Sequence, residues 1–270
     1  MNRLYKKYVK TDTLPTLFCP GCGNGIVQYA TIKAIDALNI KEEIACVSGI
    51  GCSSWIPCYL KLDVMHTMHG RAIAFAEGLK LARPDKKIMV FTGDGDCLAI
   101  GGNHFLHACA RNIDLTVIMV NNYIYGMTGG QKSPATPEGS RTKTSPFGSM
   151  DEALDGSALA MAMGASYVAR WTTAHPVQLE KAIKEGLEHK GFSFIEVLCQ
   201  CPVQAGKGVY GEKDPAAIMK MYRQKTYEYK EGMEIPEDKI RIGTLKHDKA
   251  AREYIEKIEE KLAEQSVRKG

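Results

Sequence analysis

The sequence has 270 residues, of which 44% are hydrophobic and 24% charged, and this is the composition of one large α/β domain or two small ones rather than of a disordered chain. Its 35 Lys and Arg against 31 Asp and Glu leave a net charge of only +4, which argues against a nucleic-acid-binding protein. No apolar run approaches the roughly 20 residues that span a bilayer. The charged N-terminal segment also lacks the apolar centre of a signal peptide. We therefore expect a cytoplasmic protein with neither a nucleic acid nor a membrane as partner.

Apolar patterns in the first two-thirds of the chain alternate between helix and strand periods. Helical spacing recurs over residues 25–39, 71–82, 98–110, 156–163 and 176–189. Short apolar runs predict strands over residues 44–48, 87–92, 115–120, 166–169 and 192–198. Unbroken apolar strands that alternate with helices predict an α/β fold, with a mostly parallel sheet and helices on both faces.

Two segments do not follow this alternation. Residues 128–150 are rich in Gly, Ser, Thr, Pro and Lys, and they are too long for a simple connection, so we expect a functional loop. The chain after residue 205 is irregular and then charged, with Ile255, Ile258 and Leu262 on one helical stripe. We therefore expect an α/β domain over residues 1–205 and a C-terminal extension over residues 206–270 that ends in a charged helix.

Nine cysteines, without a secretory signal, argue against a disulfide framework. Cys19-Pro-Gly-Cys22 holds two thiolates close together, which suits zinc, an iron–sulfur cluster or a redox dithiol. Zinc would need a second pair of ligands at regular spacing, and a thioredoxin-like motif would follow a strand, whereas residues 11–16 are rich in Thr and Pro. Elimination favours an iron–sulfur cluster, which requires two further thiolates.

Polar or glycine-rich sequences follow four of the predicted strands, at residues 49–54, 93–96, 121–122 and 199–201. The carboxyl ends of parallel strands meet at one edge of a sheet, where ligands bind. Asp94 precedes Asn122 by 28 residues, enough for one helix and one strand, so the two side chains should lie side by side. Carboxylate, amide and carbonyl oxygens suit Mg²⁺ bound to phosphates. The sequence therefore predicts a cation-bridged pyrophosphate, with Gly51, Ser53 and Ser54 as donors to it.

Other nucleotide-binding motifs fit less well. Gly49-x-Gly51-x-x-Ser54 has Ser in place of the third glycine of a dinucleotide fingerprint, and no acidic residue ends a strand about 20 residues later. The phosphate-binding loop pattern is absent, because Gln131 precedes Lys132.

At this point a family resemblance can be stated. Gly93-Asp94-Gly95 followed by Asn121-Asn122 resembles the thiamine-diphosphate-binding motif. Further matching motifs are Cys19-Pro-Gly-Cys22-Gly, Ser48-Gly-Ile-Gly-Cys52-Ser, His69-Gly-Arg71 and Tyr125-Gly-Met-Thr-Gly-Gly-Gln131. Together they resemble the beta subunits of 2-oxoacid:ferredoxin oxidoreductases, and among these the 2-oxoglutarate (KorB-like) members. The likeness runs from about Cys19 to Cys201.

The resemblance implies a thiamine-diphosphate-binding fold and three bound groups. It assigns Mg²⁺ to Asp94, Asn122 and the carbonyl of Ile124. It assigns contacts with thiamine diphosphate to Ile50, Gly51, Cys52, Ser53, His69, Gly70, Gly93, Gly95, Asp96, Gly126 and Met127. It assigns a [4Fe-4S] cluster to Cys19, Cys22, Cys52 and Cys201, with Cys199 as the alternative fourth ligand.

The implied activity is the oxidative decarboxylation of 2-oxoglutarate to succinyl-CoA with reduction of ferredoxin. The implied partners are an alpha subunit, gamma and delta subunits in larger assemblies, ferredoxin, coenzyme A and the 2-oxoacid. In this family a Glu that activates the cofactor lies on the alpha subunit, and no candidate for it is found here, so we expect the chain alone to be inactive.

The substrate itself stays open. Arg71, Lys132 and Arg141 are candidates to meet its carboxylates, although Arg71 can instead support the diphosphate loop and the other two can be solvent-exposed. Pyruvate and branched-chain oxoacids are alternative substrates. Two readings of another class also stay open: an iron–sulfur electron-transfer protein with a vestigial phosphate site, and a zinc-stabilised binding module.

Overall fold

Eight strands form one sheet, in the order β2-β1-β3-β4-β8-β7-β10-β9, in the computed structural model, which describes residues 2–229, 234, 236 and 238–267. Neighbouring strands are parallel except for β10, which runs antiparallel to β7. The strands are β1 (Ile44–Ser48), β2 (Asp63–His66), β3 (Lys87–Gly93), β4 (Leu115–Asn121), β7 (Tyr167–Thr172), β8 (Phe192–Leu198), β9 (Thr226–Glu228) and β10 (Ile240–His247). A separate antiparallel pair joins β5 (Ile124–Tyr125) to β6 (Gln131–Lys132). The mostly parallel sheet that the sequence predicts is confirmed.

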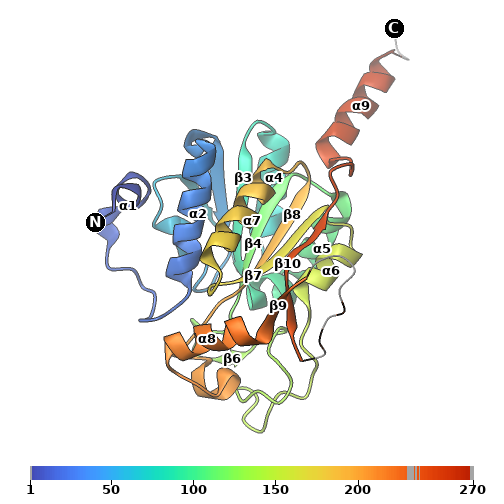
Figure 1. Cartoon of the computed structure of the whole chain (residues 1–270). Helices are drawn as coiled ribbons and strands as arrows, with labels where there is room; N and C mark the ends of the chain where they lie inside the picture. Colours follow the sequence, from blue (N-terminus) through green and yellow to red (C-terminus); the bar gives the residue numbers. More distant parts are fainter. Residues whose placement is uncertain (1, 230–233, 235, 237, 268–270) are drawn as a thin grey trace.

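Helices cover both faces of this sheet, as Figure 1 shows. The α-helices of the described residues are α1 (Arg3–Tyr8), α2 (Asn24–Leu38), α3 (Trp55–Cys58), α4 (Ala72–Ala82), α5 (Gly102–Arg111), α6 (Gly156–Ala162), α7 (Pro176–Glu188), α8 (Pro215–Lys225) and α9 (Tyr254–Val267). One buried apolar cluster packs α2 and α7 against the sheet, and a second packs α4, α5 and α6 against it. The prediction of helices on both faces is therefore confirmed.

Local sequence explains where several of these helices begin and end. Asn39 ends α2 in the left-handed conformation, with φ 54°, and its N–H bonds to the last turn of the helix. Pro176 occupies the first turn of α7, where its missing N–H costs nothing. Asp155 caps α6, because its carboxylate accepts a hydrogen bond of 2.8 Å from the N–H of Ala158.

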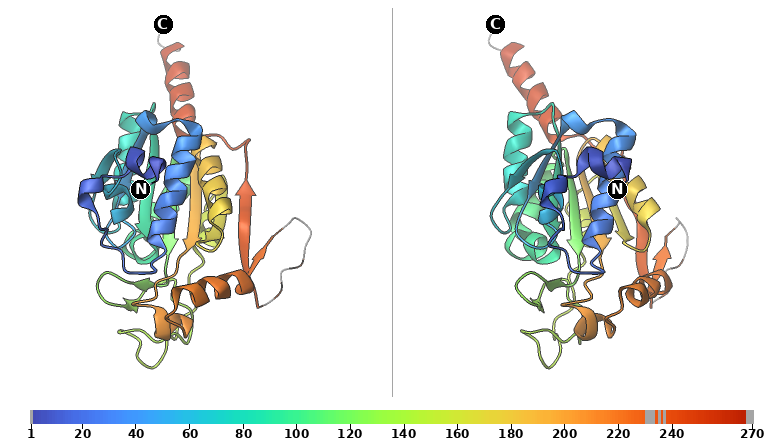
Figure 2. Two further views of the ribbon diagram at one scale, coloured as in Figure 1. Left: turned by 60° about the vertical axis from the view of Figure 1, so that its left-hand side comes forward. Right: turned by 90° about the vertical axis from the view of Figure 1, so that its left-hand side faces the viewer.

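The predicted strands lie within one to three residues of the observed ones, but one helix begins later than predicted. The helix expected from residue 98 begins at Gly102, because Asp96–Ile100 form a π-helical turn. Residues after 206 contribute α8, β9, β10 and α9, and β10 pairs with β7 in the main sheet. The charged terminal helix α9 extends away from the sheet in both views of Figure 2.

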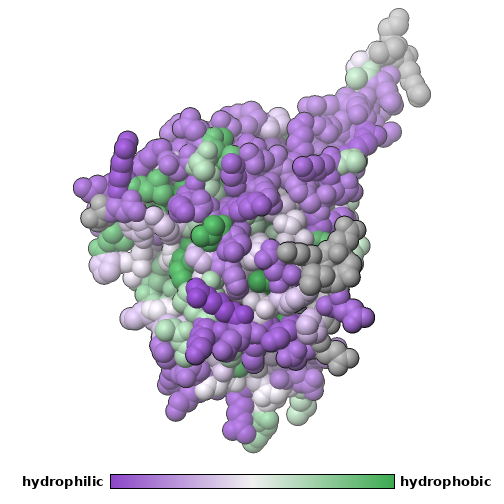
Figure 3. Space-filling view, viewed as in Figure 1, coloured by the Kyte–Doolittle hydropathy of each residue, from purple (hydrophilic) through white to green (hydrophobic). Residues whose placement is uncertain are grey.

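The surface is mostly polar on the face drawn in Figure 3, including α9, with small hydrophobic patches. Among the described residues, no helix combines the length and the apolar character needed to cross a bilayer.

The topology brings the four unusual strand ends together. Strands β1, β3, β4 and β8 are consecutive neighbours and parallel, so the residues that follow them meet at one edge of the sheet. In Figure 1 this edge faces α8 and β6, away from α9.

Candidate functional site

A cavity of about 190 Å³ opens at this edge of the sheet. Its walls come from the ends of β1, β3 and β4, the turn before α4 and the loop after β5. The lining residues are Ile50, Gly51, Cys52, Ser53, His69, Gly93, Asp94, Gly95, Asp96, Val120, Asn122, Ile124, Tyr125, Gly126, Met127 and Thr128. The structure thus brings together the candidate Mg²⁺ ligands and the candidate cofactor contacts, except Gly70, which lies behind His69. Ser54 also lies outside this wall, and its buried hydroxyl has no hydrogen-bond partner among the described residues.

Asp94 places a buried carboxylate in the wall of this cavity. Its exposed fraction is 2%, and the hydroxyl of Ser133 donates a hydrogen bond to it. Burial raises the pKa of Asp94 from 3.8 to about 7, although Ser133 and the N–H groups of Asp94, Gly95 and Asn122 act in the opposite direction. A bound cation would compensate the negative charge of this buried carboxylate.

A sharp turn after β4 places Asn122 and Ile124 in the same cavity wall as Asp94. The side chain of Asn121 accepts the N–H of Tyr123 (3.1 Å), and that of Asn122 accepts the N–H of Ile124 (3.2 Å). Tyr123 takes the left-handed conformation, with φ 66°, which reverses the chain. Within the described residues, no three His, Cys, Asp or Glu side chains form a site for a single metal ion. The oxygen atoms that could ligate a cation here belong to the carboxylate of Asp94, the side-chain amide of Asn122 and the backbone carbonyl of Ile124.

A buried ion pair supports this turn from below. The Nε of Arg170 lies 2.8 Å from Oε2 of Glu196, on the neighbouring strand. The other oxygen of Glu196 accepts the side-chain amide of Asn121 (2.8 Å), and Ser157 donates to Oε2 (2.6 Å). Asp155 also pairs with Arg170. This network fixes the end of β4 just before Asn122.

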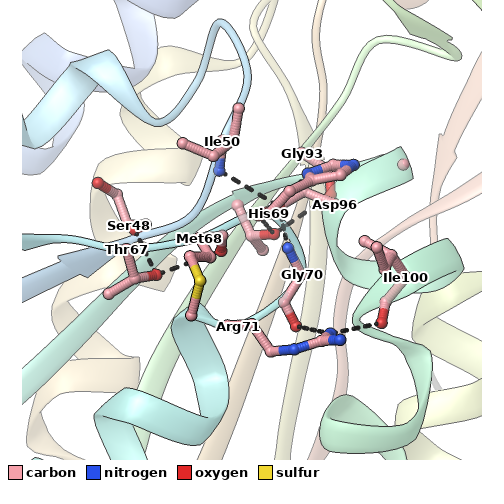
Figure 4. Close-up of polar contacts among 12 residues, drawn as sticks. Ser48, Ile50, Thr67, Met68, His69, Gly70, Arg71, Gly93, Asp96 and Ile100 are labelled. Carbon is pink, nitrogen blue, oxygen red and sulfur yellow. Dashed lines mark hydrogen bonds and ion pairs between the residues drawn. The ribbon is translucent and has the colours of Figure 1, made fainter.

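Asp96, which also lines the cavity, is surrounded by donors (Figure 4). Its Oδ1 lies 2.6 Å from Nδ1 of His69, 2.6 Å from the N–H of Gly70 and 3.3 Å from the N–H of Ile50. Its Oδ2 accepts the hydroxyl of Thr92 at 2.7 Å. Because Oδ1 of Asp96 already acts as the acceptor of two backbone N–H groups, we assign the hydrogen in this contact to Nδ1 of His69.

Four cysteines line a second cavity, of about 380 Å³. They are Cys19, Cys22, Cys52 and Cys201. Burial, followed by repulsion from the three other thiolates, raises the pKa of Cys52 to about 12. Cys199 is buried outside this wall, where its thiol lies 3.9 Å from the side chain of Asn24. A hydrogen bond with Cys199 is the main cause that lowers the pKa of Cys22 to about 7.

The two cavities share a wall. Cys52, Asn122, Gly126 and Met127 line both of them. A Cβ added at Gly126 would lie 3.5 Å from the sulfur of Cys52 and 3.8 Å from that of Cys201. At this point the backbone of Gly126 lies between Asn122 and two of the four thiols, those of Cys52 and Cys201.

Comparison with known proteins now identifies the family. The family described as "Thiamine pyrophosphate enzyme, C-terminal TPP binding domain" matches residues 49–197, just over half of the chain. The 2-oxoglutarate synthase subunit KorB of Methanocaldococcus jannaschii is 55% identical over 87% of this chain and 87% of its own length. The KorB subunit of Archaeoglobus fulgidus is 46% identical over 100% of this chain and 98% of its own. This chain belongs to the KorB family of oxidoreductase subunits.

A solved structure agrees with this assignment. The 2-oxoglutarate:ferredoxin oxidoreductase from Magnetococcus marinus, with 2-oxoglutarate, coenzyme A and succinyl-CoA bound, matches with a TM-score of 0.85 and 31% identity. The match covers 96% of this chain and 90% of that one. The resemblance to KorB-like subunits and the thiamine-diphosphate-binding fold, both predicted from the sequence, are therefore confirmed.

The three candidate substrate cations of this KorB family member lie outside both cavity walls. Arg71 donates to the carbonyls of Gly70 (3.3 Å) and Ile100 (3.1 Å), so it supports the turn that carries His69. Lys132 is paired with Asp151. Arg141 is exposed, and its backbone N–H bonds to the carbonyl of Gly208 (2.9 Å).

Several residues that line the two cavities or contact their walls were not predicted from the sequence. Ser133 donates to Asp94 from the long loop, while Trp55 and Gln204 line the cysteine cavity. Tyr125 and Thr128 line the smaller cavity. Tyr125 and Thr128 lie in the motif of residues 125–131, which could have identified them. Ser133 has no such local signal, because only the folded loop brings it to Asp94.

Proposed function

We propose that this chain is the beta subunit of a CoA-acylating 2-oxoglutarate:ferredoxin oxidoreductase. It would bind thiamine diphosphate, Mg²⁺ and a [4Fe-4S] cluster, and act with an alpha subunit. The observation that carries the proposal is the shared wall, in which Cys52 and Gly126 lie between buried oxygen donors and a cavity lined by four cysteines.

The residues around Asp94 fit a cation-bridged diphosphate. Asp94 is 2% exposed and forms no ion pair with any residue that the structure describes, which is costly for a carboxylate, and Mg²⁺ would relieve that cost. Asn122 and the carbonyl of Ile124 supply further oxygen ligands on the same cavity wall. Gly51, with φ 143°, is a position that favours glycine, and its loop exposes backbone N–H groups that suit phosphate oxygens.

The cysteine cavity fits an iron–sulfur cluster. Burial and the negative charge of the three neighbouring thiolates raise the pKa of Cys52. Bound iron would offset this repulsion, since metal ligation keeps thiolates deprotonated. A four-iron cluster spaces its sulfur ligands farther apart than a single ion does, which is compatible with the lack of a compact metal site among the described residues. Cys201, on the wall, is a better fourth ligand than Cys199, behind it.

When bound, thiamine diphosphate supplies the carbon nucleophile for decarboxylation of 2-oxoacids, and an iron–sulfur cluster accepts electrons singly. The residues of this chain bind and orient these groups. Asp94, Asn122 and Ile124 would hold the cation, His69 and the residues 50–53 would face the diphosphate, and Cys19, Cys22, Cys52 and Cys201 would ligate the iron.

The composition of the cavity wall favours a partner subunit. Its only carboxylates are those of Asp94 and Asp96, and no glutamate lines the described part of it, so the activating Glu is expected from the alpha subunit. Large apolar side chains are exposed near this edge and in the loop after β6, including Met127 (47%), Phe147 (93%) and Met150 (88%). Such surface is typical of a region that a partner covers. Larger assemblies would add gamma and delta subunits.

The choice of 2-oxoglutarate rests on the relatives named above. Its second carboxylate needs a cation, and Arg141 is exposed while Lys132 already has a partner. A cation from the partner subunit can serve equally well. Nine free cysteines in the described residues favour a reducing compartment, so we propose that the enzyme works in the cytoplasm with ferredoxin as acceptor.

Anaerobic co-purification with the native partners tests this function. The complex is assayed with 2-oxoglutarate, pyruvate and a branched-chain 2-oxoacid, each with coenzyme A and a viologen dye. We expect dye reduction and succinyl-CoA with 2-oxoglutarate, iron and acid-labile sulfide in the beta subunit, and no turnover by that subunit alone. A preference for pyruvate or a branched-chain acid would change the substrate, and turnover by the single chain would contradict the split site.

An electron-transfer protein with a vestigial phosphate site is the second candidate, favoured by the cysteine cavity alone. It predicts that Asp94→Ala leaves all activity intact, whereas the proposed function predicts loss of 2-oxoacid-dependent dye reduction with the iron content unchanged. Zinc without iron or sulfide would instead indicate a zinc-stabilised binding module.

A further inference from the structure

Asp96 has no free oxygen to offer a ligand. Its exposed fraction is 3%, and its two oxygens accept hydrogen bonds from four groups of the chain. These donors come from three segments: the loop after β1, the turn before α4 and strand β3. An additional anion, such as a diphosphate, would be repelled by this carboxylate rather than bound by it.

The donors show what Asp96 does instead. Figure 4 shows the ring of His69 and the N–H groups of Ile50 and Gly70 directed at this one carboxylate. Since Nδ1 of His69 is held by Asp96, Nε2 is the ring nitrogen available to a ligand in the cavity that His69 lines. The same carboxylate sets the position of the loop that contains Ile50 and Gly51.

Two glycines make this close approach possible. A Cβ on Gly49 would collide with the carboxylate of Asp96. Gly70 has φ 68°, and a Cβ there would collide with Ile100 and with the backbone N of Gly101, so the turn can reach Asp96 only with glycine. Arg71 strengthens the same turn by bonding the carbonyls of Gly70 and Ile100.

We propose that Asp96 is a positioning residue for the diphosphate end of the cofactor, which acts through His69 and the Ile50 loop and does not touch the cofactor with its own side chain. This inference rests on the proposed function, and it changes the role of Asp96 from the direct contact that the family resemblance implies. Supporting groups of this kind, when removed, typically weaken affinity or activity by about 10–100-fold.

Equilibrium binding to the assembled complex tests the proposal. The complex is stripped of thiamine diphosphate, saturated with Mg²⁺ and titrated with thiamine diphosphate. We expect Asp96→Ala to weaken binding by about 10–100-fold. Asp96→Asn should lose less, because its amide oxygen still accepts from His69 and Gly70 while Thr92 can donate or accept at the other position. Asp85→Ala, which removes an exposed aspartate paired with Arg83, is the control and should bind as the unaltered complex does.

A double variant separates positioning from a general structural role. If Asp96 acts through His69, the variant with both Asp96→Ala and His69→Ala binds about as weakly as Asp96→Ala alone, because the two losses share one cause. Gly49→Ala, which displaces the carboxylate without removing it, should weaken binding as well. Asp96→Asn should raise the KM for thiamine diphosphate, while kcat at saturating cofactor stays within about threefold of the unaltered value.

The outcomes are distinct. Unchanged or tighter binding by Asp96→Ala would overturn the inference, because removal of a carboxylate that faces a diphosphate relieves repulsion. Losses that multiply in the double variant would overturn the action through His69. Failure of the unaltered complex to bind thiamine diphosphate would overturn the proposed function and this inference with it, whereas normal binding by both the unaltered complex and Asp96→Ala would overturn the inference alone.

Discussion

Replacing the candidate Mg²⁺ ligand Asp94 by Asn should stabilise the cofactor-free protein while it abolishes cofactor binding. Burial raises the pKa of Asp94 from 3.8 to about 7, and at 1.36 kcal/mol for each pKa unit this corresponds to about 4 kcal/mol. The folded-state pKa of Asp94 lies above the unfolded one. The folded protein is therefore more stable by this amount below pH 4, where Asp94 is protonated, and it loses this stability as the pH rises through about 7. At pH 8 the ionised carboxylate is therefore most destabilising.

The amide variant removes that charge but cannot satisfy every donor around it. Asn has one acceptor oxygen, whereas Asp94 accepts from Ser133 and from nearby N–H groups, so about 1–2 kcal/mol is lost again. A net gain of about 2–3 kcal/mol remains, which corresponds to a rise of roughly 4–5 °C in the Tm of a chain of this size. Thermal unfolding of the cofactor-free protein at pH 8 measures it, and the gain should shrink as the pH is lowered to 5.

Two comparisons complete the test. Asp85→Asn is the matched control, because Asp85 is exposed and Arg83 lowers its pKa to about 2, so no gain is expected there. Addition of thiamine diphosphate and Mg²⁺ should raise the Tm of the unaltered protein and leave that of Asp94→Asn unchanged. A Tm for Asp94→Asn below that of the unaltered protein at pH 8, without divalent cations, would refute the assignment of Asp94 as a carboxylate held at a cost for its ligand.

Three further predictions concern the thiols and the buried ion pair. Cys201→Ser should lose iron and acid-labile sulfide while Cys199→Ser retains both, and iron analysis of the anaerobic proteins decides between them; the opposite pattern would make Cys199 the fourth ligand. In iron-free protein the rate of alkylation of Cys22 by iodoacetamide should reach half its maximum near pH 7, because the thiolate predominates above that pH. Cys199→Ala should move this midpoint to higher pH. A midpoint near pH 9 in the unaltered protein would contradict the hydrogen bond between the two thiols. Glu196→Ala should lower the free energy of unfolding by about 3–5 kcal/mol, because it leaves Arg170 without its main buried partner, and a loss below 1 kcal/mol in denaturant titration would show that Asp155 suffices.

The strands that position the site could be predicted because each is buried on both faces. The run 115–120 is apolar at every position except Thr116, and the observed bounds of its strand follow the sequence closely. Parallel order then requires the residues after β3 and β4 to meet, so the pairing of Asp94 with Asn122 needed no more than the spacing. Cys52 lies near Asp94 and Asn122 because β1, which precedes it, is the parallel neighbour of β3.

Other parts of the fold carry no such local signal. Strand β2 is an edge strand whose residues are largely exposed, and α3 is only four residues long. Strand β10 mixes apolar and charged residues and is only partly buried, because it lies near the other edge. Asp96 reads as one more acidic residue of a turn, since its partners His69 and Ile50 are distant in sequence. Cys199 and Cys201 lie only two residues apart, and nothing in their local sequence indicates which of them lines the cysteine cavity.

The thinnest point of the molecule under the proposed function is residue 126. With only hydrogen at its α-carbon, the backbone there keeps the sulfur of Cys52 and the amide of Asn122 each within 3.5 Å of the space that a methyl group would fill. A methyl group there would make only ordinary van der Waals contacts with both atoms, whereas a larger side chain would crowd them. If both cavities hold the proposed groups, a larger residue at position 126 would lengthen the distance that an electron has to cross, while each group could still be held by its own residues.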